Sequence, residues 1–334
     1  MKRNVLTSAW LTVVLTVLLT VLLGAITMAG CAAPSSSVTS ITPTLPGTPV
    51  APPVPNVAQR VQALLPLDAL LLGEQHDAPD HQRIHREVIE ALAERGALAG
   101  VVLEMAIQGN STANLVSLGS SVGADASEET IRAALKWDEQ AWPWASYAPA
   151  IMAAVRAGVP VMGSNMPRSQ MGAAMQQSSL DQRLTGPALK AQQQLIRLGH
   201  CNLLPESQIS PMTRIQIARD VAMANTLVQA HANALIANPI QPANAMNAGN
   251  TGNTGNTVTI AAKTVVLLAG SGHVDRRLGV PQHLPPNFKI KSVLLVAGNA
   301  SDAADRTADF DAVWPAAPVP PQDYCAGLKG KMAG

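Results

Sequence analysis

The sequence predicts an α/β fold, in which a mostly parallel sheet is covered by helices on both faces of a single domain. Short apolar runs without alternation recur along the chain, and amphipathic stretches lie between them. Such apolar runs are typical of strands buried on both faces, which occur in parallel sheets. An apolar fraction of 47% is ample for a packed core and excludes a wholly disordered chain.

The expected elements alternate between strand and helix along the chain. Strands are expected at the apolar runs 69–72, 100–103, 160–162, 264–268 and 292–296. Helices are expected at 79–96, 127–135, 147–157, 186–198 and 211–236. In the first of these helices Pro79 suits the first turn, Asp77 suits the N-terminal cap and Gly96 suits the end.

The N-terminus has the pattern of an exported protein. Lys2 and Arg3 form a positive start, 9–29 is uncharged and mostly apolar, and small residues lead into Cys31. This order is typical of a secretory signal peptide, here 1–30. The Cys directly after the small residues resembles a bacterial lipobox, so Cys31 is the predicted lipidation site. An uncleaved membrane anchor is the alternative, since the run is just long enough to span a bilayer.

The segment after Cys31 predicts a tether to a membrane. Ala32 rather than Asp follows the Cys, which favours the outer membrane, and the predicted location is the periplasmic side of the cell envelope. Residues 31–56 are rich in Ser, Thr and Pro and carry no charge, so they cannot form a core. A second biased stretch, 238–257, reads as a flexible surface insert. Residues 57–334 are therefore expected to form one domain.

Charge and cysteine content narrow the class of protein further. The chain has 23 basic and 22 acidic side chains, and removal of Lys2 and Arg3 changes its net charge from +1 to −1. This balance lacks the excess of positive charge that is typical of nucleic-acid-binding proteins. Beyond Cys31 the chain has only Cys201 and Cys325. Outside the cytoplasm this pair can form a disulfide, which we predict, and two buried free thiols are the alternative.

Polar residues follow several of the predicted strands. His76 follows the first strand, Glu104 ends the second and His273 follows the fourth. The carboxyl ends of parallel strands meet at one edge, where ligands bind, so these side chains should share one crevice. Two imidazoles and a carboxylate form a ligand set for a first-row transition metal ion, with Glu74 as a fourth ligand or a general base. Each motif alone more often marks a turn with a hydrogen-bonded His.

Two further groups add candidates for a flat ligand. His81 and His85 share one face of the first helix with apolar residues, either near the crevice or merely flanking the core. Four aromatic side chains lie within eleven residues in a chain otherwise poor in them: Trp137, Trp142, Trp144 and Tyr147. They form either a hydrophobic cap over the sheet or a wall for an aromatic ligand. Tyr is also a known axial ligand of haem iron.

A family resemblance extends over about 67–300. The chain is similar to the ChaN-type haem-binding uptake proteins, which belong with the Tiki and TraB proteins to one superfamily. The matching motifs, in order, are Leu71-Leu-Gly-Glu-Gln-His-Asp77, Pro79-Asp-His81, Val101-Val-Leu-Glu-Met105, Lys136-Trp-Asp138, Trp142-Pro-Trp144 with Tyr147, Gly163-Ser-Asn-Met-Pro-Arg168, Gly199-His-Cys-Asn202, Ala218-Arg-Asp220 with Met223-Ala224, Ala269-Gly-Ser-Gly-His273 and Leu278-Gly-Val-Pro281. The specificity lies in their order, since no single motif is distinctive.

The resemblance implies a ChaN/EreA-like fold and a lipoprotein that binds haem for iron uptake. A homodimer with haem at its interface and an outer-membrane haem receptor are candidate partners. The residues offered to haem are Trp142 and Trp144 for its face, Arg168 for a propionate, and Tyr147, His81 or His85 for the iron. The family pattern has a second His beside the position of His81, where this chain has Gln82.

The superfamily implies an alternative function. In that function His76, Glu104 and His273 hold a metal ion in a hydrolase, and Glu74 is the catalytic residue beside them. An envelope lipoprotein whose site has lost its chemistry is the third possibility. Haem binding is the function that we predict, because the similarity is closest to the haem-binding subgroup.

Overall fold

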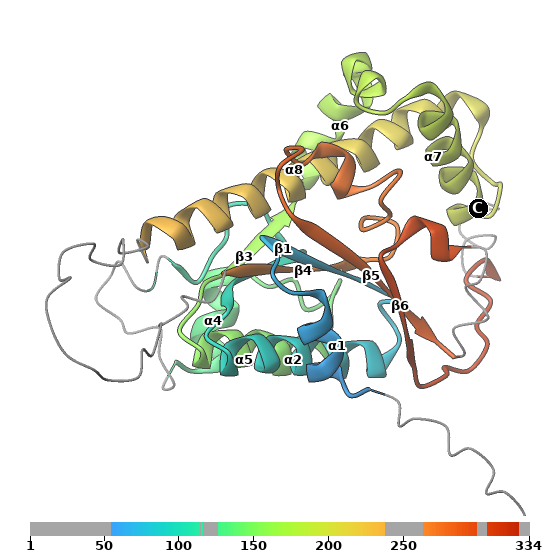
Figure 1. Ribbon diagram of the computed structural model, residues 1–334. Helices are drawn as coiled ribbons and strands as arrows, with labels where there is room; N and C mark the ends of the chain where they lie inside the picture. Colours follow the sequence, from blue (N-terminus) through green and yellow to red (C-terminus); the bar gives the residue numbers. More distant parts are fainter. Residues whose placement is uncertain (1–54, 114, 116–125, 238–262, 299–305, 327–334) are drawn as a thin grey trace, which may run out of the picture. The chain divides into compact units, whose positions relative to one another are not determined.

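The computed structural model describes residues 55–113, 115, 126–237, 263–298 and 306–326, which belong to one compact unit, Val54–Gly334 (Figure 1). The predicted signal peptide at 1–30, Cys31, nearly all of the tether and the insert at 238–257 lie outside these residues. None of the helices in the described ranges is both long and apolar enough to cross a membrane.

Six parallel strands form one sheet in the order β3-β2-β4-β1-β5-β6, which confirms the predicted α/β fold. The strands are β1 Ala69–Glu74, β2 Leu98–Ile107, β3 Val161–Asn165, β4 Thr264–Gly270, β5 Ile290–Ala297 and β6 Ala312–Ala316. Successive residues of β1 point to opposite faces, and both faces are covered. Leu70 and Leu72 join the core on one side, and Leu71 joins the core on the other.

Helices cover both faces of the sheet (Figure 1). One face packs against α1 Val57–Leu64, α2 Pro79–Glu94, α4 Glu128–Leu135 and α5 Trp144–Arg156. The other face packs against α8 Glu206–Ala237, whose first half also contacts α6 Arg168–Gln176, η1 Ser178–Arg183 and α7 Gly186–Gly199. A short 3₁₀ turn, η2 Val280–His283, precedes β5.

Several element boundaries differ from the predictions. Asp77 does not cap α2, whose N-cap is Ala78 without a side-chain hydrogen bond, because the Asp77 carboxylate accepts hydrogen bonds from Gln75 and Tyr324 instead. Helix α8 begins before Pro211, one turn earlier than predicted. Strand β6 was not expected, because it contains Pro315. Pro is tolerated there because β6 is the edge strand of the sheet.

The register of the sheet brings the strand ends level with one another. In the parallel pair β1 and β4, Glu74 lies beside Gly270. In the pair β2 and β4, Leu103 lies beside Leu268, so Glu104 follows at the same edge. Strand β1 has β4 on one side and β5 on the other, and the loops that leave β1 and β4 open onto one cavity.

Candidate functional site

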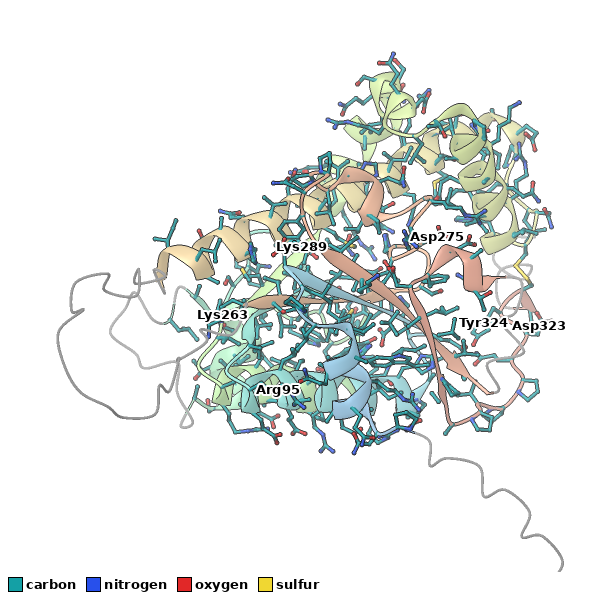
Figure 2. All side chains as sticks on the ribbon, in the orientation of Figure 1. Arg95, Lys263, Asp275, Lys289, Asp323 and Tyr324 are labelled. Carbon is teal, nitrogen blue, oxygen red and sulfur yellow. A yellow bond between two sulfur atoms is a disulfide. The ribbon has the colours of Figure 1, made fainter. Side chains whose placement is uncertain are left out.

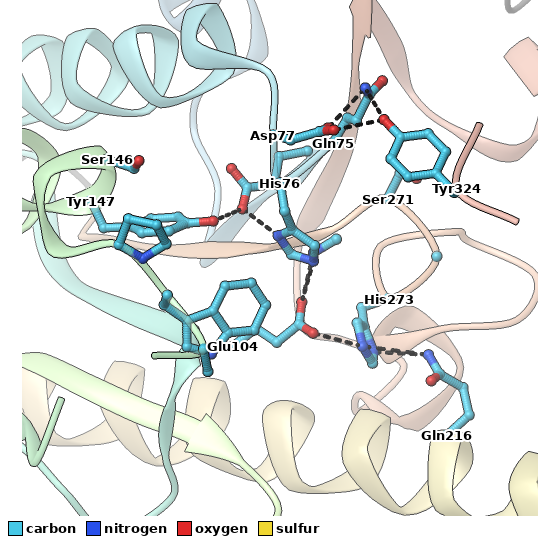
Figure 3. A pocket seen from close by; sticks show the side chains of 16 residues that line it. Gln75, His76, Asp77, Glu104, Ser146, Tyr147, Gln216, Ser271, His273 and Tyr324 are labelled. Atoms are coloured by element: carbon cyan, nitrogen blue, oxygen red, sulfur yellow. Dashed lines mark hydrogen bonds and ion pairs between the residues drawn. The ribbon is translucent and has the colours of Figure 1, made fainter. Parts of the chain in front are cut away.

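The cavity has a volume of about 730 Å³ and lies beyond the carboxyl ends of β1, β2 and β4 (Figure 3). Its walls come from the loop after β1, the start of α5, the loop after β4, α8 and the C-terminal segment. The residues that line it are Glu74, Gln75, His76, Asp77, Glu104, Ala141, Trp142, Pro143, Ser146, Tyr147, Gln216, Gly270, Ser271, Gly272, His273 and Tyr324. The predicted crevice at the strand ends is thus present.

Glu74 is a buried carboxylate that holds three neighbours in place. Its Oε1 accepts hydrogen bonds from Tyr147 Oη at 2.8 Å and from His76 Nδ1 at 2.6 Å. Its Oε2 accepts one from Gln82 Nε2 at 2.9 Å. Burial alone would raise the pKa of Glu74, but the hydrogen bond from His76 and the charges of nearby imidazoles bring it below its usual value. Glu74 is therefore ionised at neutral pH.

His76 stands between two carboxylates and faces the cavity. Its side chain is 37% exposed, and its Nε2 lies 3.7 Å from Glu104 Oε2, on the side away from Glu74. The edge of its ring contacts Trp142, with 4.7 Å between ring centroids. Burial lowers the pKa of His76, but Glu74 and Glu104 raise it by more, so the pKa is above its ordinary value. The two carboxylates therefore favour the protonated form of this imidazole.

Glu104 lies between His76 and His273 and is almost completely buried. Its Oε1 is 3.4 Å from His273 Nε2, and its Oε2 accepts a hydrogen bond from the Gly270 backbone N–H at 2.7 Å. Burial would raise the pKa of Glu104, but His273 and His76 lower it below its usual range. A side chain at position 270 would place its Cβ 2.9 Å from His76 Nε2, so Gly270 allows the close approach of these groups.

Helix α8 holds His273 from the other side. Asp220 Oδ1 lies 2.6 Å from His273 Nδ1, and the Gln216 side-chain amide lies 3.1 Å from the same atom. Burial opposes the charge of His273, but Glu104 and Asp220 raise its pKa well above the ordinary value. Burial raises the pKa of Asp220. The carboxyl group therefore gives up its proton less readily, which limits the negative charge buried beside His273. The pair is closed to solvent, since both side chains are almost wholly buried.

Two of the four clustered aromatic residues line the cavity. Trp142 and Tyr147 meet edge to face, with 6.1 Å between ring centroids. Trp144 does not line it, because its indole is buried and donates to Glu128 Oε2 at 2.8 Å. Trp137 donates its indole N–H to the Trp142 carbonyl and so stabilises the backbone that carries Trp142. Part of the cluster thus packs behind the loop and part lines the cavity; that the lining residues contact an aromatic ligand stays a prediction.

His81, His85 and Arg168 lie away from the cavity. His81 is buried and its Nδ1 accepts a hydrogen bond from the Gln75 backbone at 2.9 Å, so it supports the loop that carries His76. His85 is buried too, and burial lowers its pKa to about 4, so it is neutral. Arg168 is exposed at the first position of α6. Because none of these three residues lines the cavity, none is placed to contact a ligand there.

The three predicted metal ligands do converge. His76 and His273 both lie within 3.7 Å of Glu104. Their arrangement is that of ion pairs, and no three His, Cys, Asp or Glu side chains of the described ranges are grouped as one metal ion requires. Metal binding at this point needs neutral imidazoles, so it competes with the two ion pairs. Metal ligation stays a prediction.

Sequence reasoning missed four contacts that shape the site. Gln82, which departs from the family pattern, donates to Glu74 and also to the His76 carbonyl. Gln216 and Asp220 lie one helical turn apart on α8, a spacing that could have marked them as one polar patch on a buried face. Tyr324 lines the cavity rim from the C-terminal segment, which no local pattern indicated.

The structure joins Cys201 and Cys325 in a disulfide, with Cα atoms 5.8 Å apart. The bridge connects the turn after α7 to the C-terminal segment across 124 residues of sequence. This is the pairing that the sequence analysis expects of an exported chain.

Comparison with known proteins agrees with this fold. The family model described as haem-binding uptake, Tiki superfamily, ChaN matches residues 60–284. A solved structure of cofacial haem binding to ChaN of Campylobacter jejuni is similar, with 22% identity over 72% of this chain and 86% of that chain and a TM-score of 0.51. The type III effector HopBA1 matches more weakly, with 14% identity over 79% and 94% and a TM-score of 0.40. No curated protein matches the sequence.

Proposed function

The chain belongs to the ChaN family of haem-binding uptake proteins in the Tiki superfamily, and on that premise we propose that its cavity binds haem for iron uptake. The observation that carries the proposal is Tyr147, an almost fully buried residue of the cavity lining whose ring meets Trp142 edge to face and whose phenol donates to Glu74. Ferric haem supplies a flat aromatic face, an iron that accepts an axial phenolate, and two propionates. A cavity of about 730 Å³ has the size of ordinary small-molecule sites.

The phenol of Tyr147 needs a proton acceptor before its oxygen can act as a ligand. Burial and the negative charge of Glu74 raise the pKa of Tyr147 above its ordinary value, so the phenol is protonated in the free protein. Glu74 Oε1 accepts its hydrogen bond at 2.8 Å and is the nearest base. His76 donates to the same oxygen and stabilises the carboxylate. We assign Glu74 the role of orienting the Tyr147 phenol through this hydrogen bond; because its own pKa is lowered, Glu74 is a weak base, and loss of the phenol proton would have to be driven by binding to the ferric iron.

The propionates have a different partner from the one that the sequence predicted. Among the described residues, neither Lys nor Arg lines the cavity. His76 is the exposed basic group there, and Glu74 and Glu104 favour its protonated form because they raise its pKa. We assign it to a propionate in place of Arg168, and the second propionate then extends into solvent.

The proposed role in the cell rests on Cys31, through which the protein would be attached to the outer membrane. A haem-uptake protein at the outer membrane would transfer haem to or from a receptor, so an outer-membrane haem receptor is one proposed partner. A second copy of the chain is the other. Cys31→Ser should abolish lipidation and release the protein from the membrane fraction, which fractionation and mass measurement would check. A variant that stays membrane-bound and unprocessed would mean that the leader is an uncleaved anchor.

A metal-dependent hydrolase is the second candidate, favoured by one observation. Glu104 lies between two imidazoles at the strand ends, and Glu74 is a carboxylate close enough to act as a base. In that function His76, Glu104 and His273 would hold a metal ion that activates water. Neutral imidazoles are required, so metal binding would strengthen as the pH rises.

An absorption titration of the purified protein with haemin, followed by metal analysis of the same sample, separates the two functions. Haem binding predicts saturable binding at one haem per cavity and a Soret band that shifts from that of free haemin. Absence of saturable binding, together with a stoichiometric transition metal, would favour the hydrolase. Asp181→Asn is the control variant: it removes a partly buried ion pair with Arg214, and neither of these two residues lines the cavity.

A further inference from the structure

The C-terminal segment contributes one residue to the cavity from outside the family match. The match ends at residue 284, whereas Tyr324 lines the cavity rim. From the end of β6 to Asp323 the chain has no regular secondary structure, yet it returns to the strand ends. The arrangement of this segment therefore depends on a few specific contacts.

Two hydrogen bonds fasten the Tyr324 phenol to the loop after β1, and a third joins its two partners. Its Oη donates to Asp77 Oδ2 at 2.7 Å and accepts from Gln75 Nε2 at 3.0 Å. Gln75 Nε2 also donates to Asp77 Oδ1 at 2.9 Å, which closes a ring of three side chains. Gln75 and Asp77 are the two neighbours of His76 in sequence. Tyr324 is thus fixed relative to the imidazole that faces the cavity.

A covalent bond fixes the same residue from its other side. Cys325 follows Tyr324 directly and is bonded to Cys201 in the turn after α7, and Asp323 accepts the Cys325 backbone N–H at 2.9 Å (Figure 2). The disulfide anchors the segment to the helices that pack on α8. Without it, the hydrogen bonds of one phenol would have to order the whole segment.

The ring held in this way is itself not part of the core. Tyr324 is 55% exposed, and it lies across His76 from Tyr147 in the view of Figure 3. A large aromatic side chain that is fixed by hydrogen bonds and left half in solvent has apolar surface that a ligand would cover.

We propose that Tyr324 is a ligand-contacting residue, whose ring forms the wall of the cavity across from Tyr147, and that the Cys201–Cys325 disulfide holds it there. The identity of the ligand rests on the proposed haem binding. The phenol oxygen keeps its bonds to Asp77 and Gln75, so Tyr324 packs on the face of the ligand and does not ligate its iron. The disulfide is accordingly a positioning element of the binding site.

Haemin titrations of the full-length oxidised chain test this inference. Tyr324→Ala removes the wall and should weaken haemin binding by about 3- to 10-fold, the usual range for one aromatic contact. Tyr324→Phe keeps the ring and should cost less than about 3-fold. Gln322→Ala, two residues away and not among the cavity-lining residues, is the control and should change nothing. All variants should keep the wild-type Soret maximum, because the axial ligand is unchanged.

The positioning role of the disulfide is tested by asking whether its loss and the loss of the Tyr324 ring have additive effects on haemin binding. Replacing both Cys201 and Cys325 by Ser should weaken haemin binding about as much as Tyr324→Ala, and combining the two changes should add little. Reduction of the wild type should reproduce the effect, whereas reduction should leave the Ser variant unaffected. Circular dichroism of each variant identifies any that does not fold.

The outcomes separate the inference from the proposed function. If the wild type binds haemin and Tyr324→Ala binds it equally well, Tyr324 is no contact residue and the inference is wrong. Fully additive losses would overturn the role of the disulfide. A changed spin state in Tyr324→Phe would mean that its oxygen ligates iron, which contradicts the wall assignment. A wild type without saturable haemin binding would overturn the proposed function and this inference with it.

Discussion

The two imidazoles of the cavity have similar partners and different surroundings. Each has a carboxylate at Nδ1, Glu74 for His76 and Asp220 for His273, and both face Glu104 through Nε2. The side chain of His76 is 37% exposed, whereas that of His273 is 7% exposed. The pKa of Glu74 is lowered and that of Asp220 is raised.

This difference indicates a division of roles. On the Glu74 side the His76 imidazole is exposed to the cavity and is available for binding, whereas Glu74 and Tyr147 behind it are almost fully buried. The His273 half is sealed by α8 and keeps Glu104 in place. A buried ion pair adds little stability by itself, but loss of one partner is costly because it strands a charge. The two halves should therefore respond differently to substitution.

Glu104→Gln should have the largest effect, because Glu104 is the one carboxylate that both halves share. It leaves two cationic imidazoles without their common partner and should lower the free energy of unfolding by about 3 kcal/mol or more. Urea denaturation followed by circular dichroism measures this. Glu87→Gln, in a surface pair with Arg83 on α2, makes the same chemical change and should cost no more than about 0.5 kcal/mol. Equal losses in the two variants would contradict the proposed role of Glu104.

Replacing each His by Gln sharpens the comparison between the halves. His273→Gln should cost about 2 kcal/mol, because it breaks a buried network, although Asp220 can take up a proton to limit the cost. His76→Gln should cost less, about 1 kcal/mol, because the buried Glu74 carboxylate keeps its hydrogen bonds from Tyr147 and Gln82. Haemin affinity should follow the reverse order and fall more for His76→Gln. If both variants lose stability and affinity alike, the division of roles is wrong.

The stability of the buried half should depend on pH in a defined direction. Because the folded state raises the pKa of His273 from 6.5 to about 10, the folded chain retains a proton that the unfolded chain loses. The stabilisation from His273 is fully present below pH 6.5 and is lost as the pH rises through 10. The difference in unfolding free energy between wild type and His273→Gln should shrink over that window, by at most about 1.4 kcal/mol per pH unit. A difference that stays constant with pH would show that His273 is neutral in the folded protein.

Sequence patterns predicted the parts of the molecule that depend on local order. The five apolar runs were recognisable because β1 to β5 are buried on both faces or nearly so. The strand-end position of His76, Glu104 and His273 followed from parallel topology alone. Strand β6 was missed although Ala312–Ala316 is a short apolar run, because Pro315 within it argues against a strand and is tolerated only at the edge of a sheet.

The contacts of the site were less predictable, because they join segments far apart in the chain. Asp220 and Gln216 meet His273 only because α8 packs on the sheet, and periodicity does not reveal which polar residue on a helix is buried inward. Tyr324 is held at the rim by two hydrogen bonds of its phenol and by the disulfide at the next residue, Cys325, none of which leaves a local pattern. His81 and Arg168 were assigned to the ligand by position along the chain, and their side chains lie away from the cavity.

The ferric spectrum of the haemin complex, compared between wild type and Tyr147→Phe, tests the central claim most directly. Removal of the hydroxyl keeps the ring and its packing against Trp142, and so separates ligation from structure. An axial phenolate predicts a high-spin ferric complex in the wild type, and Tyr147→Phe should weaken haemin binding or change the spin state while the fold survives. An unchanged spectrum and affinity in Tyr147→Phe would contradict the account and exclude Tyr147 as the iron ligand.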